Sequence, residues 1–157
     1  MLDQDLTRAN FATSGQIYAS VLERERRGEY LGRDVQMIPH VTAEVKLRLR
    51  RLAVQSRADV VFVEIGGTAG DFENGYFIEA MRQLAYEEGP GNVLFVALTL
   101  VLEPPSLGEQ KSKAAQLGIK QLLQMGIQPH IIACRARSEV SEKVREKISL
   151  YTNCLLY

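Results

Sequence analysis

Glu64 is the first residue of this sequence whose type and position suggest chemistry. It follows the apolar run at residues 60–63 and precedes a glycine-rich loop at residues 66–70. In phosphate-handling α/β proteins, a carboxylate at the end of an apolar strand holds Mg²⁺ beside substrate phosphates. A strand-end acid that simply faces solvent is the competing interpretation, and the spacing alone leaves both open.

Two further acids lie just beyond the glycine-rich loop. Asp71 and Glu73 are two positions apart, so an extended backbone would direct both carboxylates to the same side. There they could accept hydrogen bonds from a sugar or a base. They could equally cap a helix that begins near Asn74.

A lysine pair stands where residues 108–113 pass from a loop into a helix. Lys111 and Lys113 are close to the first backbone N–H groups of that helix, which have no partner inside it. Unpaired amides, the helix dipole and two ammonium groups together form an anion site suited to phosphate. The alternative is a solvated, charged first turn, although lysine is unfavourable at this end of a helix unless an anion offsets it.

The remaining ionisable residues give weaker signals. Lys143 and Lys147 have the i, i+4 spacing of ordinary surface ion pairs. His40 and His130 have no ligand-spaced partner, so structural or solvent-facing roles are expected. We find neither a nucleophile–base pair nor a Cys/His cluster, and the sequence lacks Gly-x-x-x-x-Gly-Lys-Ser/Thr.

Composition points to one soluble domain of 157 residues, 46% of them hydrophobic. Nineteen basic and 19 acidic residues cancel, so we expect neither nucleic acid nor an anionic membrane as a partner. Cys134 and Cys154 have no metal-type spacing, and we expect them to be buried and reduced. We find no apolar span of membrane length and no leader, so a cytoplasmic location is predicted.

Patterning predicts alternating strands and helices. Helices are expected at residues 14–27, 42–56, 76–88 and 109–125 and from Ser141 onward, each with apolar positions at helical spacing. Strands are expected at residues 35–38, 59–64, 92–100 and 129–134, and those at 59–64 and 92–100 are predicted to be fully buried. The predicted fold is α/β, with a mainly parallel sheet flanked by helices on both faces.

Seven ordered segments resemble the amidoligase (synthetase) domain of the CTP synthase family. They are Thr-Ser-Gly-Gln-Ile-Tyr at 13–18, Glu-Arg-Glu-Arg-Arg-Gly-Glu-Tyr-Leu-Gly at 23–32, Val-Gln-Met-Ile-Pro-His at 35–40, Val-Glu-Ile-Gly-Gly-Thr-Ala-Gly-Asp-Phe-Glu at 63–73, Gly-Glu-Gln-Lys-Ser-Lys at 108–113, Gly-Ile-Gln-Pro at 126–129 and Lys-Ile-Ser-Leu at 147–150. The segments span nearly the whole chain.

The resemblance implies a carbon–nitrogen ligase of pyrimidine nucleotide biosynthesis. In this family UTP is phosphorylated at its 4-oxygen by ATP, ammonia from a glutaminase domain displaces the phosphate, and CTP results. Mg²⁺ and ATP are the implied cofactors. The implied fold is P-loop NTPase-like (dethiobiotin synthetase-like), and the implied assembly is a homo-oligomer, a tetramer in the family, with a UTP site drawn from more than one subunit.

The resemblance also assigns roles to particular residues. Glu64 matches the Mg²⁺-binding acid of the family. The residues that match its UTP/CTP site are Asp71, Phe72, Glu73, Lys111, Ser112, Lys113, Ala114, Ala115, Gln116 and Lys147. No catalytic residue is assigned, because the family's phosphate-binding loop with its lysine would lie before Met1, and its glutaminase domain after Tyr157.

Two hypotheses follow for residues 1–157. They form a single partial amidoligase domain of a CTP synthase, unable to turn over alone, or a non-catalytic relative that binds a pyrimidine nucleotide or assembles with a partner. The second draws on departures from the family, whose Lys-Thr-Lys-Pro-Thr-Gln is Lys-Ser-Lys-Ala-Ala-Gln at 111–116. The family's Gln-Pro-Asp also ends in His130 here, and its Gly-Asp-Ile-Glu contains Phe72.

Overall fold

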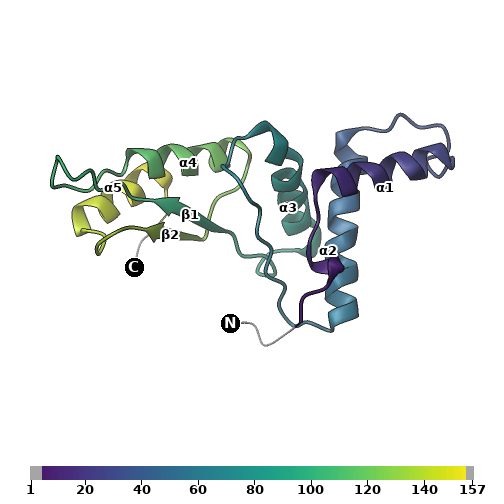
Figure 1. Ribbon diagram of the computed structural model, residues 1–157, viewed down its shortest axis with the longest axis horizontal. Coiled ribbons are helices and arrows are strands. Elements are labelled where there is room, and N and C mark those ends of the chain that lie inside the picture. The colour runs from purple at the N-terminus through teal and green to yellow at the C-terminus, as the bar shows by residue number, and fades with distance from the viewer. Residues whose placement is uncertain (1–4, 155–157) are drawn as a thin grey trace. The chain divides into compact units, whose positions relative to one another are not determined.

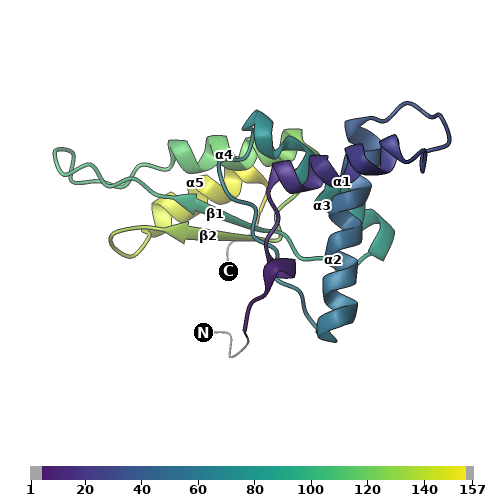
Figure 2. The same ribbon diagram turned by 45° about the vertical axis from the view of Figure 1, so that its right-hand side comes forward.

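The computed structural model describes residues 5–154 (Figures 1 and 2). The chain divides into two compact units. The first contains Met1–Gly66 and Glu73–Leu84, and the second contains Gly67–Phe72 and Ala85–Tyr157. Each unit has its own elements and is described by itself.

The first long helix, α1 (Ser14–Arg26), begins at a reciprocal capping box. The Thr13 hydroxyl accepts from the Gln16 backbone N–H at 3.3 Å, and the Gln16 side chain accepts from the Thr13 N–H at 3.2 Å. These bonds satisfy donors that the helix itself cannot pair. A short 3₁₀ helix, η1 (Arg8–Asn10), precedes α1. The predicted helix is confirmed to within a residue or two.

Helix α2 (Thr42–Ser56) confirms the second predicted helix, but the strand predicted at 35–38 is wrong. Ile38 keeps the extended dihedral angles that a following proline favours (φ −116°, ψ 123°). It lies within the kinked turn η2 (Met37–Val41), and its peptide bond to Pro39 is cis. The preference before proline therefore acts on one residue and does not create a strand.

The strand predicted at 59–64 is also wrong. These residues carry no strand assignment, and the side chains of Val60 and Phe62 are 67% and 83% exposed. A strand is stabilised by hydrogen bonds to a neighbouring strand, and among the described residues this segment has no ladder partner. Apolar composition alone does not provide that partner.

Helix α3 (Gly75–Glu88) confirms the third predicted helix and follows the short η3 (Phe72–Asn74). Tyr76, Ile78, Ala80 and Met81 are its buried residues, whereas Phe77 is half-buried. The Tyr76 hydroxyl donates to the Ser14 hydroxyl at 2.8 Å, which joins α3 to the start of α1 inside the first unit.

The second unit is built on two parallel strands, β1 (Val96–Leu100) and β2 (Ile131–Arg135). Their register pairs Val96 with Ile131 and Leu100 with Arg135. Helix α4 (Lys113–Gln124) lies between them in sequence, as a parallel crossover requires, and α5 (Glu142–Thr152) follows β2. The predicted α/β class with parallel pairing is confirmed.

The core of this unit lies between the strands and the two helices. It contains Ala97, Val101, Ala115, Ile119, Ile132, Val144, Ile148 and Cys154. Because side chains alternate across a strand, α4 and α5 both pack on the face that presents Ala97 and Ile132.

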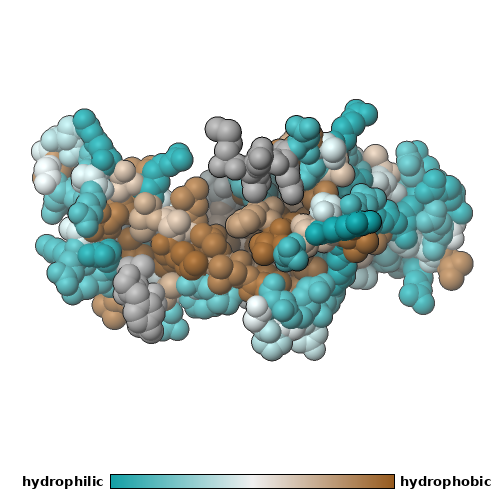
Figure 3. Space-filling model, turned by 90° about the horizontal axis from the view of Figure 1, so that it is seen from below, coloured by the Kyte–Doolittle hydropathy of each residue, from teal (hydrophilic) through white to brown (hydrophobic). Residues whose placement is uncertain are grey.

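The other face of the two strands is apolar and exposed. Val96, Leu98 and Leu100 are 56%, 71% and 49% exposed, and Figure 3 shows apolar side chains gathered on this side of the unit. The prediction of a fully buried strand at 92–100 is therefore wrong, and within this unit the helices lie on one face, not on both. No helix in the described part of the chain has the length and apolar character needed to cross a membrane.

Candidate functional site

Lys111 is held just beyond the end of β1. Its backbone N–H donates to the Leu102 carbonyl at 2.7 Å, and the Leu102 N–H donates back to the Lys111 carbonyl at 3.3 Å. This two-residue antiparallel bridge brings the loop at 103–110 back toward the sheet. The Lys111 ammonium donates to the carboxylate of Glu109.

Glu109 is paired with Lys111, and the charges of two lysines on α5 also act on it. The pKa of Glu109 lies below its ordinary value, first because Lys111 hydrogen-bonds to it and then because of the Lys111 charge. The charges of Lys143 and Lys147 on α5 lower this pKa further. The charges of Lys111 and Lys147 therefore both act on one carboxylate, although 36 positions separate the two lysines in sequence. We call Lys111, Lys143 and Lys147 the lysine cluster.

Helix α4 begins next to this cluster without a side-chain cap. Ser112 is its N-cap, yet the Ser112 side chain makes no capping bond within the described structure. Its hydroxyl instead accepts from the Gln116 side chain at 3.0 Å, and both residues are buried. The first N–H groups of α4 remain available to an anion, as expected at an uncapped helix start.

The predicted segment 111–116 is only partly accessible. Lys113 and Ala114 are exposed, whereas Ala115 is 0% exposed and belongs to the hydrophobic core. The side chains of Ser112 and Gln116 are hydrogen-bonded to each other. The groups of this segment that can reach a ligand directly are therefore its two lysines and the backbone amides.

Asp71 and Phe72 belong to the same unit, and they follow Gly70, which lies against another part of α4. The Asp71 carboxylate accepts from the Thr68 N–H at 3.0 Å, which closes a local turn. Gly70 has φ +99°, and a Cβ there would come within 2.8 Å of the Gln121 side chain. Gln121 follows Lys113 by eight residues, or about 12 Å along the helix. Phe72 is 97% exposed.

Glu64 and Glu73 belong to the first unit, whereas the lysine cluster belongs to the second. Both are exposed, and Glu73 lies within η3. Among residues 5–154, no three His, Cys, Asp or Glu side chains form a group that could hold a metal ion. A single carboxylate such as Glu64 is compatible with a Mg²⁺ that arrives bound to nucleotide phosphates, because such ions use one or two carboxylates plus phosphate oxygens.

The histidines have structural roles, as predicted. His40 Nδ1 accepts from the Gln36 N–H at 3.0 Å, and its ring meets Tyr30 edge-on at 4.9 Å. His130 Nδ1 accepts from the Phe95 N–H at 3.0 Å, and the two rings stack.

The two cysteines, both predicted to be buried, differ in their exposure. Cys154 is buried and Cys134 is half-buried. Burial raises the pKa of the Cys134 thiol, which disfavours the reactive thiolate.

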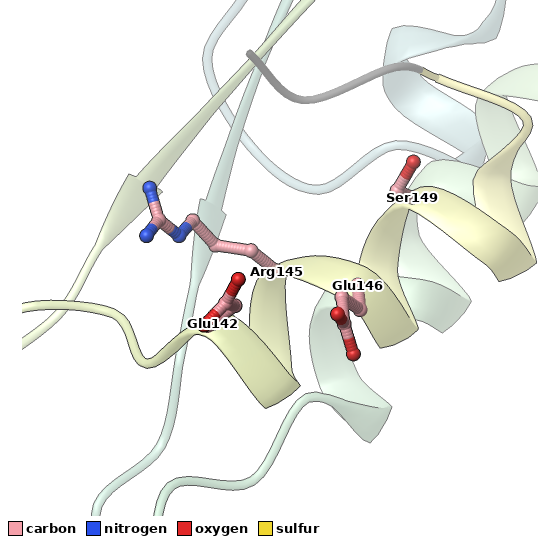
Figure 4. Close-up of a pocket in the computed structure, with 4 residues that line it drawn as sticks. All are labelled: Glu142, Arg145, Glu146 and Ser149. Carbon is pink, nitrogen blue, oxygen red and sulfur yellow. The ribbon is translucent and has the colours of Figure 1, made fainter.

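The hollow on α5 contains none of the predicted site residues. Figure 4 shows it lined by Glu142, Arg145, Glu146 and Ser149. Two carboxylates and one guanidinium do not favour an anion. The i, i+4 pair Lys143 and Lys147 occupies a different stripe of the same helix.

Sequence reasoning misses part of this site. The spacing of Lys143 and Lys147 predicts only surface ion pairs. Glu109 lies in the loop-to-helix segment at 108–113 and has no predicted role of its own. The one clue in the sequence is that the two lysines share one side of a helix. Their spacing does not show that their charges act on Glu109. That interaction arises from the packing of α4 and α5.

The fold and site define an α/β protein with a parallel sheet, whose lysine cluster lies beyond the carboxyl end of a strand, where ligands of such sheets bind. The chain belongs to the family described as the CTP synthase N-terminus, whose sequence profile matches residues 1–155.

Similar proteins include a CTP synthase of Thermus thermophilus, 48% identical over 152 residues. Those of Dehalococcoides mccartyi strain BAV1 and Methanosarcina acetivorans are 49% and 47% identical over 150 residues each. The matches cover 96–97% of this chain and 28% of each relative. The chain therefore spans 28% of the length of these relatives.

Proposed function

We propose that this chain is the UTP/CTP-binding part of a CTP synthase, which aminates UTP to CTP with hydrolysis of ATP. The observation that carries the proposal is the ion pair of Lys111 with the exposed carboxylate of Glu109 beside the start of α4, where the charges of Lys143 and Lys147 also act. Family membership supplies the identity of the ligand, and the lysine cluster supplies a place for its phosphates.

The nucleotide triphosphate displaces Glu109 from the cluster in this proposal. Phosphate oxygens accept stronger and more numerous charge-assisted hydrogen bonds than one carboxylate does. The uncapped amides at the start of α4 add donors to the same anion. The lysines orient the triphosphate, and they need no proton transfer to do so.

The other predicted contacts complete the proposal. Asp71, Phe72 and Glu73 contact the pyrimidine nucleotide, and Asp71 does so from a turn already ordered by Thr68. Glu64 holds Mg²⁺, which when bound neutralises phosphate charge. Ser112 and Gln116 act indirectly, by fixing the first turn of α4 through their mutual hydrogen bond.

We extend the proposal to the whole enzyme by family membership. Residues 1–157 form one partial amidoligase domain of the P-loop NTPase-like class, which works with an ATP phosphate loop and a glutaminase domain. The chain assembles as a homo-oligomer, and alone it does not turn over. The cytoplasmic location stays a prediction.

The second candidate function is a non-catalytic relative that binds a pyrimidine nucleotide or acts as an assembly module. The observation that favours it is Ala115, which replaces a family threonine and lies in the core with no polar group to offer. The two candidates differ in whether a completed enzyme can turn over, and the second, as an assembly module, need not bind a nucleotide.

Calorimetric titration of the full chain with UTP, CTP and ATP, each with Mg²⁺, tests the binding. We expect UTP and CTP to bind, and Lys147→Gln to weaken them about tenfold or more, the contribution of one charge-assisted bond. Arg145→Gln is the matched control, since it removes one positive charge from another stripe of α5. Equal loss in both variants, or no binding of either nucleotide, contradicts the proposal.

Turnover is tested separately with UTP, ATP, Mg²⁺ and an ammonium salt. We expect no CTP from this chain alone. Phosphoryl transfer depends on positioning the phosphates, and the sequence contains no loop of the Gly-x-x-x-x-Gly-Lys-Ser/Thr type to do this. CTP formation above that of a heat-denatured sample contradicts this part.

A further inference from the structure

The carboxylate of Glu103, just after β1, binds the loop that leads into α5. Its Oε1 accepts from the backbone N–H groups of Arg137 and Ser138 at 3.1 and 3.0 Å. Its Oε2 accepts from the Ser138 hydroxyl at 2.9 Å. The Ser138 backbone bond is the main reason that the pKa of Glu103 lies below its ordinary value. Glu103 therefore holds the 137–138 turn as an ionised acceptor.

The side chain of Gln110 joins the same network from the opposite loop. Its Nε2 donates to Glu103 Oε1 at 3.1 Å, to the Ser138 hydroxyl at 3.1 Å and to the Glu139 carbonyl at 2.8 Å. Its Oε1 accepts from the Ser141 backbone N–H at 2.9 Å. We call Glu103, Gln110 and Ser138 the polar latch.

The latch spans the two segments that carry the lysine cluster. Gln110 lies between Glu109 and Lys111 in sequence, and Ser141 is the N-cap of α5, two residues before Lys143. One side chain thus ties the loop at 108–111 to the first turn of the helix that bears Lys143 and Lys147.

The lysine cluster needs such a connection. The three ammonium groups repel one another. If the two segments that carry them were not joined, binding an anion would cost the conformational entropy of ordering both segments. Apolar packing of α4 and α5 involves Ala115, Ile119, Val144 and Ile148, which lie under the helices and not at the loop. The hydrogen bonds of the latch, in contrast, join the loop directly to the start of α5.

We propose that the polar latch positions Lys111 and the α5 lysines as one preassembled anion site, with Glu103 and Gln110 acting as positioning residues that do not touch the ligand. The ligand class, a nucleoside triphosphate, rests on the proposed function. The geometry of the latch does not depend on it.

The decisive experiment follows the Glu109 carboxyl by NMR titration in the full chain without ligand. We expect Gln110→Leu to raise the pKa of Glu109 toward its ordinary value, by as much as the Lys143→Gln/Lys147→Gln double variant does, because the α5 charges move away. Gln124→Leu, an exposed glutamine at the end of α4, is the matched control and leaves this pKa unchanged. An unchanged Glu109 pKa in a folded Gln110→Leu protein overturns the latch.

Binding provides the second readout, with CTP and inorganic tripolyphosphate as probes. We expect Gln110→Leu to weaken both about tenfold, and to add little to the loss caused by Lys147→Gln, because both changes act on the same cluster. If the affinity losses of Gln110→Leu and Lys147→Gln are fully additive in the double variant, the positioning role of the latch is overturned. A shifted Glu109 pKa without binding of either probe supports the latch and overturns the proposed function, so the two failures are distinguishable.

Glu103→Gln keeps the shape of the side chain and removes its charge. We expect it to reproduce the Gln110→Leu effects in part, since an amide oxygen still accepts while the charge-assisted bonds to Arg137 and Ser138 are weakened. Circular dichroism and a thermal melt establish that each variant is folded. A folded Glu103→Gln protein with unaltered Glu109 pKa and unaltered affinity for both probes contradicts the role of Glu103.

Discussion

Glu44 and Arg48 form an ion pair one turn apart on α2, with Arg48 Nε 2.8 Å from Glu44 Oε1, and the Glu44 side chain is only 6% exposed. Arg48 also donates to the Ser20 hydroxyl at 2.7 Å and to the Gln16 carbonyl at 3.2 Å. Arg48 therefore attaches α2 to α1, and it is held in place by a carboxylate that water barely reaches.

Removal of one partner of this pair is expected to destabilise the first unit. Arg48→Met leaves the Glu44 carboxylate buried and short of its closest partner, which costs about 3 kcal/mol. Urea unfolding followed by circular dichroism measures the loss. Glu25→Gln, at an exposed position of α1, is the control and is expected to stay within about 0.5 kcal/mol of the parent. A loss below about 1 kcal/mol for Arg48→Met contradicts the prediction.

Two adjacent alanines at the start of α4 allow the effect of core packing on stability to be compared with that of a surface substitution. Ala115 is 0% exposed in the core and Ala114 is exposed, so Ala115→Leu must displace its neighbours while Ala114→Leu need not. We expect Ala115→Leu to cost about 1–3 kcal/mol of unfolding free energy and Ala114→Leu to be near neutral. Thermal and urea unfolding check this, and equal effects contradict the placement of α4.

The hydrogen bond from Tyr76 to Ser14 is a polar contact between α3 and α1. Burial raises the pKa of Tyr76, despite the bond to Ser14, so the hydroxyl stays a donor at neutral pH. Tyr76→Phe is expected to cost about 1 kcal/mol of stability. A double-mutant cycle with Ser14→Ala checks that the bond is the cause. Independent, additive effects of the two changes argue against it.

Glu103 gives the second unit a defined pH dependence. Its pKa is lower in the folded chain, so its contribution to stability is present above the ordinary glutamate pKa of 4.5 and is lost as pH falls through the lower folded value. We expect the wild-type protein to be more stable than Glu103→Gln at neutral pH, and the difference to shrink on acidification. Urea midpoints over a pH series measure it, and a difference that is constant or grows toward low pH contradicts the assignment.

Local signals in the sequence determined the helices of this protein. Thr13 and Gln16 cap α1 through bonds within four residues, and Gly28, with φ +75°, follows its end. These interactions are complete within a short stretch of chain, so patterning predicts them well. The same holds for the class of the fold, because apolar runs alternating with amphipathic helices favour parallel strands.

Tertiary structure decided what depends on partners distant in sequence. The apolar run before Glu64 looks like a strand but finds no neighbour to pair with among the described residues, and Leu98 is exposed because both helices of its unit pack on the opposite face. Whether a segment forms a strand depends on a neighbouring strand, and whether it is buried depends on the helices that cover it. The composition of one segment contains neither piece of information.

The candidate site divides in the same way. The sequence by itself determined which residues carry charge, and family resemblance named Lys111 and Lys147 among them. Only the tertiary structure brought these lysines to one carboxylate and put Gln110 between their segments, because hydrogen bonds across 28 to 35 positions depend on the packing of α4 against α5.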